Sequence, residues 1–211
     1  MDKKLVRNLG AWTLVFGILA MLFYMLHDIV GAMYYPGYDP MTQAVSDLTA
    51  ADAPSYTVAS GYTKVYGIFS CLCNVFVCLL MRDHKKPLRI GIYLITAMNF
   101  TSAVGYALFP LTGSGYDGSF QSFVHVYVIT AIVVLLSIVS LIFIAVGSFK
   151  EGKKLLGIFA LITLACFFTA PASFALPSVF GIVERFSTYG ACVFTLILSV
   201  AVFRESVSLS D

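Results

Sequence analysis

Six ionisable residues in this sequence are of types that bind ligands or transfer protons, and all lie within or beside strongly apolar segments. They are His27, Asp28, Asp47, His125, Glu184 and Arg185. A neutral imidazole beside a carboxylate can act as a general base or hold a metal, and an arginine can pair with a carboxylate inside a pocket. No metal-binding spacing such as H-E-x-x-H is present, so the residue types alone carry this prediction.

The composition indicates a membrane protein. Of the 211 residues, 59% are hydrophobic and only 11% are charged, and the mean hydropathy is +0.90. Soluble domains carry about 25% charged residues. The sequence therefore excludes a water-soluble enzyme, a nucleic-acid-binding protein and a disordered chain. The five cysteines all lie in apolar runs, where a thiol packs like a small hydrophobic group.

Six apolar runs are long enough to cross a bilayer, since a helix needs about 20 apolar residues for this. The runs cover residues 9–35, 62–81, 89–109, 123–148, 155–176 and 179–203. We therefore expect an all-α, polytopic membrane protein whose six helices form one bundle and one domain, residues 1–211.

The basic residues predict the orientation. All but Lys64 and Arg185 of the 13 Lys and Arg residues fall at the N-terminus, near the C-terminus or in the second and fourth connections. Positively charged segments stay in the cytoplasm, so both termini are predicted to be cytoplasmic in the cell membrane. Six acidic residues fall on the opposite, outer side, which would attract cationic groups. They are Asp28, Asp39, Asp47, Asp52, Asp117 and Glu184.

The longest outer connection, residues 36–61, predicts a short amphipathic helix. Asp39-Pro40 is typical of an N-cap followed by proline at the first helical position. The apolar residues Met41, Ala44, Val45 and Leu48 then share one helical face. On this helix Asp47 flanks the apolar face and is expected to turn inward, whereas Ser46 points away.

The ionisable residues converge at one depth, because five segments, counting the loop with Asp47 and the second span with Lys64, each bring one or two of them to the outer end of the bundle. His125 opens the fourth span, where the positive end of the helix dipole favours a neutral imidazole. Deeper in the membrane, Asn99, Ser102 and Tyr106 share one helical face. These residues form either the floor of an outer pocket or hydrogen bonds between helices, and the sequence leaves both possibilities open.

The chain also resembles a known family. Its outer-loop segment from Tyr38 to Leu48 (YDPMTQAVSDL) resembles the signature that follows the first span in the prokaryotic domain of unknown function 998 (DUF998). Leu108-Phe109-Pro110, His125 and the segment from Gly181 to Phe186 are further similarities, in the same order. The resemblance implies a six-helix membrane fold with no agreed activity. It singles out Ser46, Asp47, His125, Glu184 and Arg185, and His27 and Asp28 match less clearly.

The first hypothesis for function is an outward-facing polar pocket that binds a small molecule or a lipid head group. Asp47 and Arg185 would form its ion pair, Asn99 and Ser102 its floor and the outer loop its lid. The alternatives are an outward-facing hydrolase or transferase that uses His125 and His27, with or without a metal, a small transporter, and a structural or assembly partner. The sequence names no cofactor and no ligand, and the bilayer is the one partner that it predicts directly.

Overall fold

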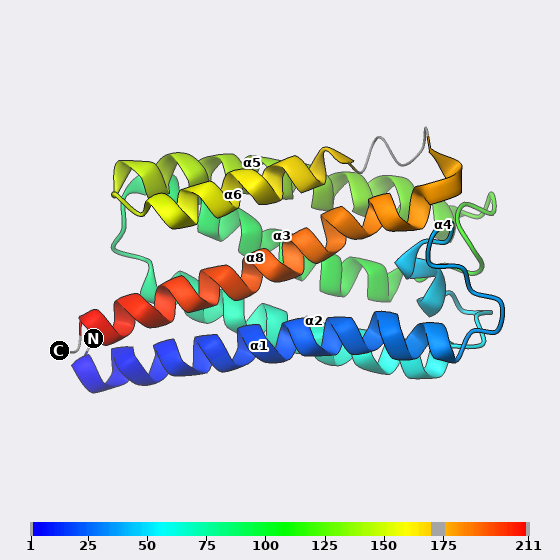
Figure 1. The fold of residues 1–211 in the computed structure, drawn as a ribbon, viewed down its shortest axis with the longest axis horizontal. Helices are drawn as coiled ribbons and strands as arrows, with labels where there is room; N and C mark the ends of the chain where they lie inside the picture. Colours follow the sequence, from blue (N-terminus) through cyan, green and yellow to red (C-terminus); the bar gives the residue numbers. More distant parts are fainter. Residues whose placement is uncertain (1, 170–175, 210–211) are drawn as a thin grey trace.

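The computed structural model describes residues 2–169 and 176–209, and within these ranges the chain is helical with no strands. Figure 1 shows its long helices. They are α1 (Lys3–Met33), α2 (Tyr56–Leu80), α3 (Lys86–Leu108), α5 (Thr130–Lys150), α6 (Lys154–Phe167) and α8 (Phe180–Ser208). Shorter elements are the 3-10 helices η1 (Val45–Thr49) and η3 (Pro177–Val179), the α-helix α4 (Phe120–Phe123) and the π-helix η2 (Val124–Ile129).

The apolar helices agree with the expectation of a polytopic membrane bundle. Five helical segments are long and apolar enough to cross a membrane: α1, α2, α3, the continuous stretch Phe120–Lys150 and Pro177–Ser208. The sixth, α6, is also apolar but has 14 residues. Residues 170–175 of the predicted fifth span lie outside the described residues.

The long helices form a closed ring. Each packs on the next in chain order, from α1 through α2, α3, α5 and α6 to α8, and α8 packs back on α1. Both termini lie together at one end of the bundle (Figure 1), which we call the terminal end. The connection between α1 and α2 and that between α3 and α4 lie at the opposite end, which we call the loop end.

The bundle is apolar inside and outside. Its core contains fully buried residues of α2, α3, α5 and α8, including Val77, Ile92, Ile144 and Phe194. Many large apolar side chains are exposed along the outside of the helices, such as Trp12, Ile68, Leu135 and Ile162. Lipid is the solvent that suits such a surface, because in water a patch of this extent would drive association.

The first connection does not form the amphipathic helix predicted after Asp39-Pro40. Asp39 caps a single turn, in which its carboxylate accepts hydrogen bonds from the Met41 amide and the Thr42 hydroxyl. The Met41 carbonyl, which would continue a helix, instead accepts hydrogen bonds from the first amides of α8. Because hydrogen bonds from another helix replace those within the segment, the chain continues as the five-residue helix η1.

Candidate functional site

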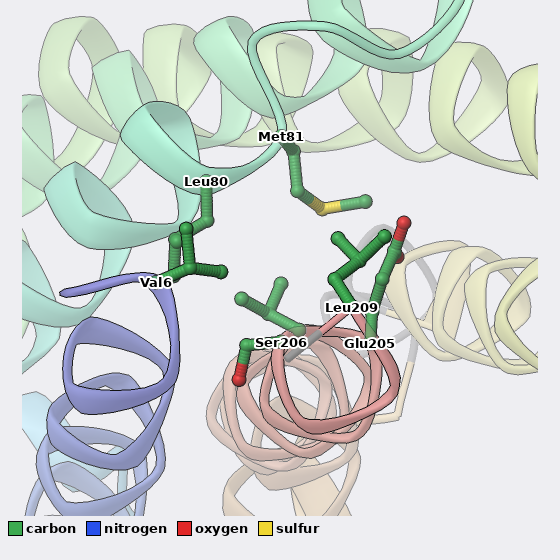
Figure 2. A pocket seen from close by; sticks show the side chains of 7 residues that line it. Val6, Leu80, Met81, Glu205, Ser206 and Leu209 are labelled. Atoms are coloured by element: carbon green, nitrogen blue, oxygen red, sulfur yellow. The ribbon is translucent and has the colours of Figure 1, made fainter. Parts of the chain in front are cut away.

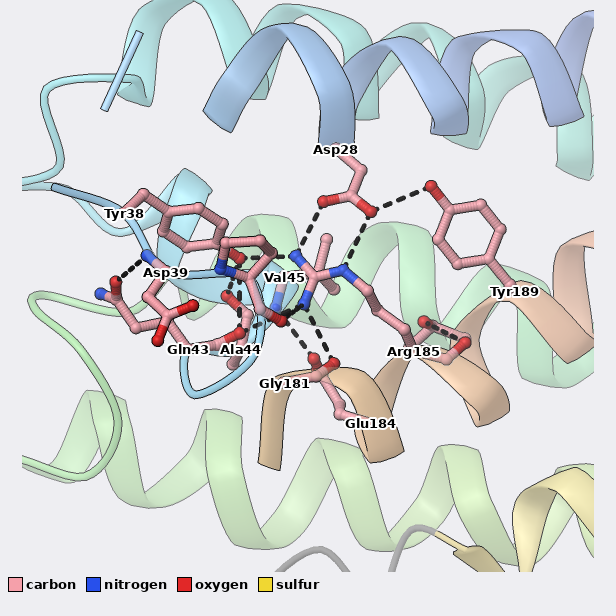
Figure 3. Close-up of polar contacts among 12 residues, drawn as sticks. Asp28, Tyr38, Asp39, Gln43, Ala44, Val45, Gly181, Glu184, Arg185 and Tyr189 are labelled. Atoms are coloured by element: carbon pink, nitrogen blue, oxygen red, sulfur yellow. Dashed lines mark hydrogen bonds and ion pairs between the residues drawn. The ribbon is translucent and has the colours of Figure 1, made fainter. Parts of the chain in front are cut away.

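An ion pair joins α1 and α8 near the loop end (Figure 3). Arg185 Nη2 lies 2.8 Å from Asp28 Oδ1, and Arg185 Nε donates to Asp28 Oδ2 at 3.0 Å. The Tyr189 hydroxyl, one turn further along α8, donates to Asp28 Oδ2 at 2.9 Å. Both charged side chains are largely buried, at 14% and 12% exposed. The predicted pairing of Arg185 with Asp47 is thus replaced by a pairing with Asp28.

The same guanidinium holds the first connection against the bundle. Its Nη1 donates to the carbonyls of Pro40, Gln43 and Gly181, and its Nη2 donates to the Tyr38 hydroxyl at 2.7 Å. A guanidinium has five N–H groups, and each nitrogen is engaged here. The Arg185 guanidinium therefore fixes the backbone of residues 38–43 against the start of α8.

The first turn of α8 completes this attachment. Gly181 donates its amide to the Met41 carbonyl at 2.8 Å, and the Glu184 carboxylate accepts a hydrogen bond from the Val45 amide at 2.8 Å. A Cβ atom on Gly181 would lie 2.2 Å from the Gln43 carbonyl oxygen, so only glycine permits this approach. The loop thus satisfies backbone donors that the N-terminus of α8 would otherwise leave free.

Asp47 connects the two long connections to each other. It is turned inward, as predicted, with 3% of the residue exposed, while Ser46 is only half-buried. The Ser114 hydroxyl, in the α3–α4 connection, donates to Asp47 Oδ2 at 2.6 Å. Burial raises the pKa of the Asp47 carboxyl, and the Ser114 hydrogen bond opposes that effect. The carboxyl group is therefore held where its charged form is disfavoured.

His125 lies apart from the ion pair, on the π-helix η2. Its Nδ1 lies 2.7 Å from the Phe109 carbonyl oxygen, which can only accept, so Nδ1 carries a proton. The ring lies 4.6 Å from that of Tyr106, centroid to centroid. A π-turn inserts an extra residue into a helix and is common at functional sites, and no periodicity in the sequence reveals it.

His27 is buried on α1 beside the ion pair. Only 2% of the residue is exposed, and its Nδ1 has no hydrogen-bond partner among the described residues. Its ring lies 5.8 Å from that of Tyr24. An unpaired buried nitrogen is costly, so His27 is a point at which a ligand or a water molecule would gain a hydrogen bond.

The polar residues at mid-depth join neighbouring helices. The Ser70 hydroxyl on α2 donates to Asn99 Oδ1 on α3 at 2.6 Å, and Asn99 Nδ2 donates to the Ile95 carbonyl. Ser102 is half-buried one turn nearer the loop end. The Asn99 carboxamide thus forms a hydrogen bond between helices, which is one of the two roles that the sequence left open.

A surface groove of about 460 Å³ runs along the seam between α6 and α8. On α6 it is lined by Phe159, Ile162, Thr163 and Cys166, and on α8 by Ile182, Arg185, Phe186, Tyr189, Gly190, Val193 and Ile197. Among the lining residues that the structure describes, Arg185 and Tyr189 are the strongly polar ones, and both also belong to the network around Asp28. The helices approach closely at Gly190, where a Cβ atom would lie 3.2 Å from that of Cys166.

One protein-family model covers most of the chain. The family described as "Protein of unknown function (DUF998)" matches residues 18–201, which include every site residue described above. The chain belongs to this family. No curated protein and no solved structure matches the chain. The resemblance inferred from the loop segment is confirmed, and the family supplies no activity.

Sequence reasoning identified the charged members of the network and missed their neutral partners. Asp28, Glu184 and Arg185 are brought together on the first connection, and Asp47 is joined to the second connection. Tyr38, Tyr189 and Ser114 were not singled out. The position of Tyr189 one turn after Arg185 was the available signal for it. Among residues 2–169 and 176–209, no group of three or more His, Cys, Asp or Glu residues could hold a metal ion.

Proposed function

We propose that this protein binds a membrane lipid in the outer leaflet, with an acyl chain in the α6–α8 groove and the head group beside the Asp28–Arg185 network. The observation that carries the proposal is that Arg185 and Tyr189 belong both to the groove wall and to the polar network. A site that is apolar along its length and polar at one end matches an amphiphile, and its volume lies in the usual range for ligand sites.

The dimensions of the groove suit an acyl chain. Its lining on α8 extends from Ile182 to Ile197, which is about 22 Å of helix at 1.5 Å per residue. One leaflet contributes about half of the 30 Å hydrocarbon core, so the groove can take the full depth of a chain from one leaflet. The deeper part is lined by Phe159, Val193 and other apolar side chains.

The orientation follows from the basic residues. Lys3, Lys4 and Arg7 begin α1 at the terminal end, and the α2–α3 and α5–α6 turns at the same end carry further Lys and Arg residues. By the positive-inside rule we place this end in the cytoplasm of a cell, and the loop end outside. Arg185 then lies near the outer end of the bundle.

The charge of the network favours a head group that carries an amine. Arg185 pairs with Asp28, and two further carboxyl groups of the loop end, those of Asp47 and Glu184, have neutral hydrogen-bond donors as partners. Negative charge on either of these two groups would attract a cationic group. We therefore propose a zwitterionic lipid with an ammonium group, rather than an anionic lipid, as the preferred ligand.

The test is photo-crosslinking in nanodiscs with a phosphatidylethanolamine whose acyl chain carries a diazirine. Labelled peptides are expected to come from α6 and α8 around Cys166 and Gly190. Val193→Trp fills the groove and should lower the labelling about tenfold, which is about 1.4 kcal/mol of lost binding. Val200→Trp is the matched control, because Val200 is similarly exposed on the same helix but does not line the groove.

Equal labelling of both variants would refute the groove as the lipid site. The same experiment with a phosphatidylglycerol probe tests the head group. Labelling as strong as that with phosphatidylethanolamine would refute the preference for an amine while leaving the groove in place.

A further inference from the structure

A second cluster of charged side chains lies at the terminal end. It joins the α2–α3 turn, the α5–α6 turn and the end of α8. His84, in the turn between α2 and α3, is placed between two carboxylates. Its Nδ1 lies 2.5 Å from Glu151 Oε2, in the α5–α6 turn, and its Nε2 lies 3.1 Å from Glu205 Oε1, near the end of α8. These contacts bring the α2–α3 turn, the α5–α6 turn and α8 to one imidazole.

Both contacts can be hydrogen bonds only if the imidazole is protonated. A neutral histidine has one N–H, so one ring nitrogen would turn its lone pair toward a carboxylate oxygen. His84 is 15% exposed in its side chain, and Glu151 is 9% exposed. At such partial burial a repulsive contact is only weakly screened. The arrangement described here is therefore that of the imidazolium.

The other charged groups around His84 show which contact would be lost when the imidazole loses its proton. Glu151 also accepts a hydrogen bond from the Lys85 amide at 2.5 Å, and the Lys85 ammonium donates to the Lys150 carbonyl. These bonds keep the two turns together without His84. Lys153 Nζ lies 2.6 Å from Glu205 Oε2, so Glu205 also keeps a partner in the α5–α6 turn.

The contact between His84 and Glu205 is thus the ion pair that joins the α2–α3 turn to α8. It forms only while the His84 imidazole is protonated. The remaining pair of this turn, Arg82 with Asp83, is exposed and stays within the turn. The carboxylates, with Glu205 as the first cause, raise the pKa of His84. The attachment is therefore present at low pH and is lost as the pH rises through this raised pKa.

A small, partly open cavity between α1, α2 and α8 lies beside this attachment (Figure 2). Val6, Leu80, Met81 and Leu209 line it together with Glu205, and its volume is about 20 Å³. That is room for about one water molecule. Movement of the last turns of α8 would separate Leu209 and Glu205 from Met81 and enlarge this space.

We propose that His84 is a pH-responsive latch: when protonated it holds the end of α8 against the α2–α3 turn and keeps the terminal-end cavity small, and when it loses its proton the last turns of α8 move away. The latch senses the pH of the compartment that faces the terminal end. It does not depend on lipid binding in the α6–α8 groove, which lies nearer the other end of α8.

Distance measurement between two spin labels tests the latch in the full-length protein in nanodiscs. Labels replace the exposed residues Lys86, at the start of α3, and Ser208, at the end of α8. At about pH 6 we expect one short distance, and at about pH 9 a second, longer one. Near the pKa of His84, the ratio of the short-distance population to the long-distance population should change by up to about tenfold per pH unit, as the linkage of one proton requires.

Two variants and one control complete the experiment. His84→Gln and Glu205→Gln should each show the longer distance at both pH values, because neither can form the ion pair. Asp83→Asn removes an exposed neighbouring charge and should respond to pH as the wild type does. An unchanged distance in the wild type between the two pH values, or a wild-type response in His84→Gln, would overturn the proposal.

Discussion

Arg185 and Asp28 are 157 residues apart in the chain and form a two-point ion pair, with nitrogen–oxygen distances of 2.8 and 3.0 Å. The pair joins α1 and α8 near the loop end, and these are the two helices that close the ring. Because the same guanidinium also holds the Pro40 and Gln43 carbonyls, the contact between two helices and the position of the first connection depend on one side chain. The loop-end part of the α6–α8 groove is therefore positioned by this residue as well.

Asp28→Asn should be strongly destabilising, because it leaves the Arg185 charge buried without its counter-ion. Breaking a buried pair in this way costs about 3–5 kcal/mol. Denaturant unfolding in detergent measures this loss. The matched control is Asp83→Asn, which breaks the exposed pair with Arg82 and should cost about 0–1 kcal/mol. Similar losses for the two variants would show that the Asp28 pair contributes no more than a surface ion pair.

Gly181→Ala should detach the first connection while leaving the helices intact. The new Cβ would lie 2.2 Å from the Gln43 carbonyl and 2.5 Å from that of Pro40, and these are backbone atoms that cannot rotate away. We expect faster proteolytic cleavage between residues 36 and 44. Gly61→Ala is the control, because a Cβ there meets nothing within 4 Å, and it should be neutral or stabilise α2 by up to about 1 kcal/mol. Equal cleavage rates would contradict the close approach.

The positions of the helices could be predicted because hydropathy reports them directly. The predicted run 89–109 corresponds to α3 at Lys86–Leu108, and the run 179–203 to α8 at Phe180–Ser208. Charged residues are excluded from the centre of a bilayer, so the convergence of Asp28, Glu184 and Arg185 at one depth also followed from the sequence. The sequence did not show which carboxylate pairs with Arg185, because Asp28 and Asp47 lie at similar depths and only packing decides between them.

Local patterns failed where another part of the chain supplies the hydrogen bonds. The residues after Asp39 have the periodicity of a helix, but α8 donates to the Met41 carbonyl and Glu184 accepts from the Val45 amide. The π-turn that carries His125 likewise leaves no trace in the hydrophobic pattern. In both places the deciding partners are distant in the sequence, so no window of neighbouring residues contains the information.

Asn99→Ala should weaken the contact between α2 and α3 and leave lipid binding unchanged. The Ser70–Asn99 hydrogen bond is 2.6 Å long, and bonds of this kind between membrane helices contribute about 0.6 kcal/mol on average, up to about 1.7. Unfolding in detergent and lipid photo-crosslinking are measured on the same preparation. Ser102→Ala serves as the neighbouring control. A loss of crosslinking in Asn99→Ala without a loss of stability would instead identify Asn99 as part of the binding site.

Asp47→Asn should be as stable as the wild type or more stable at neutral pH. Burial raises the pKa of the Asp47 carboxyl, so the folded protein favours the protonated form. The contribution of this group to stability is complete below its unfolded pKa of about 4 and is lost as the pH rises through the higher folded value. Asparagine keeps an oxygen that can accept the Ser114 hydrogen bond and carries no charge at any pH.

The free energies of unfolding of Asp47→Asn and of the wild type are compared at about pH 4 and at about pH 7. The stability of Asp47→Asn relative to the wild type should increase at the higher pH. Ser114→Ala removes a donor that favours the charged carboxylate, so it should destabilise the wild-type protein more at pH 7 than at pH 4. If Asp47→Asn is instead less stable at pH 7, the charged carboxylate is part of what holds the two connections together. If it is more stable but binds lipid less well, the charge is retained for binding at the expense of stability.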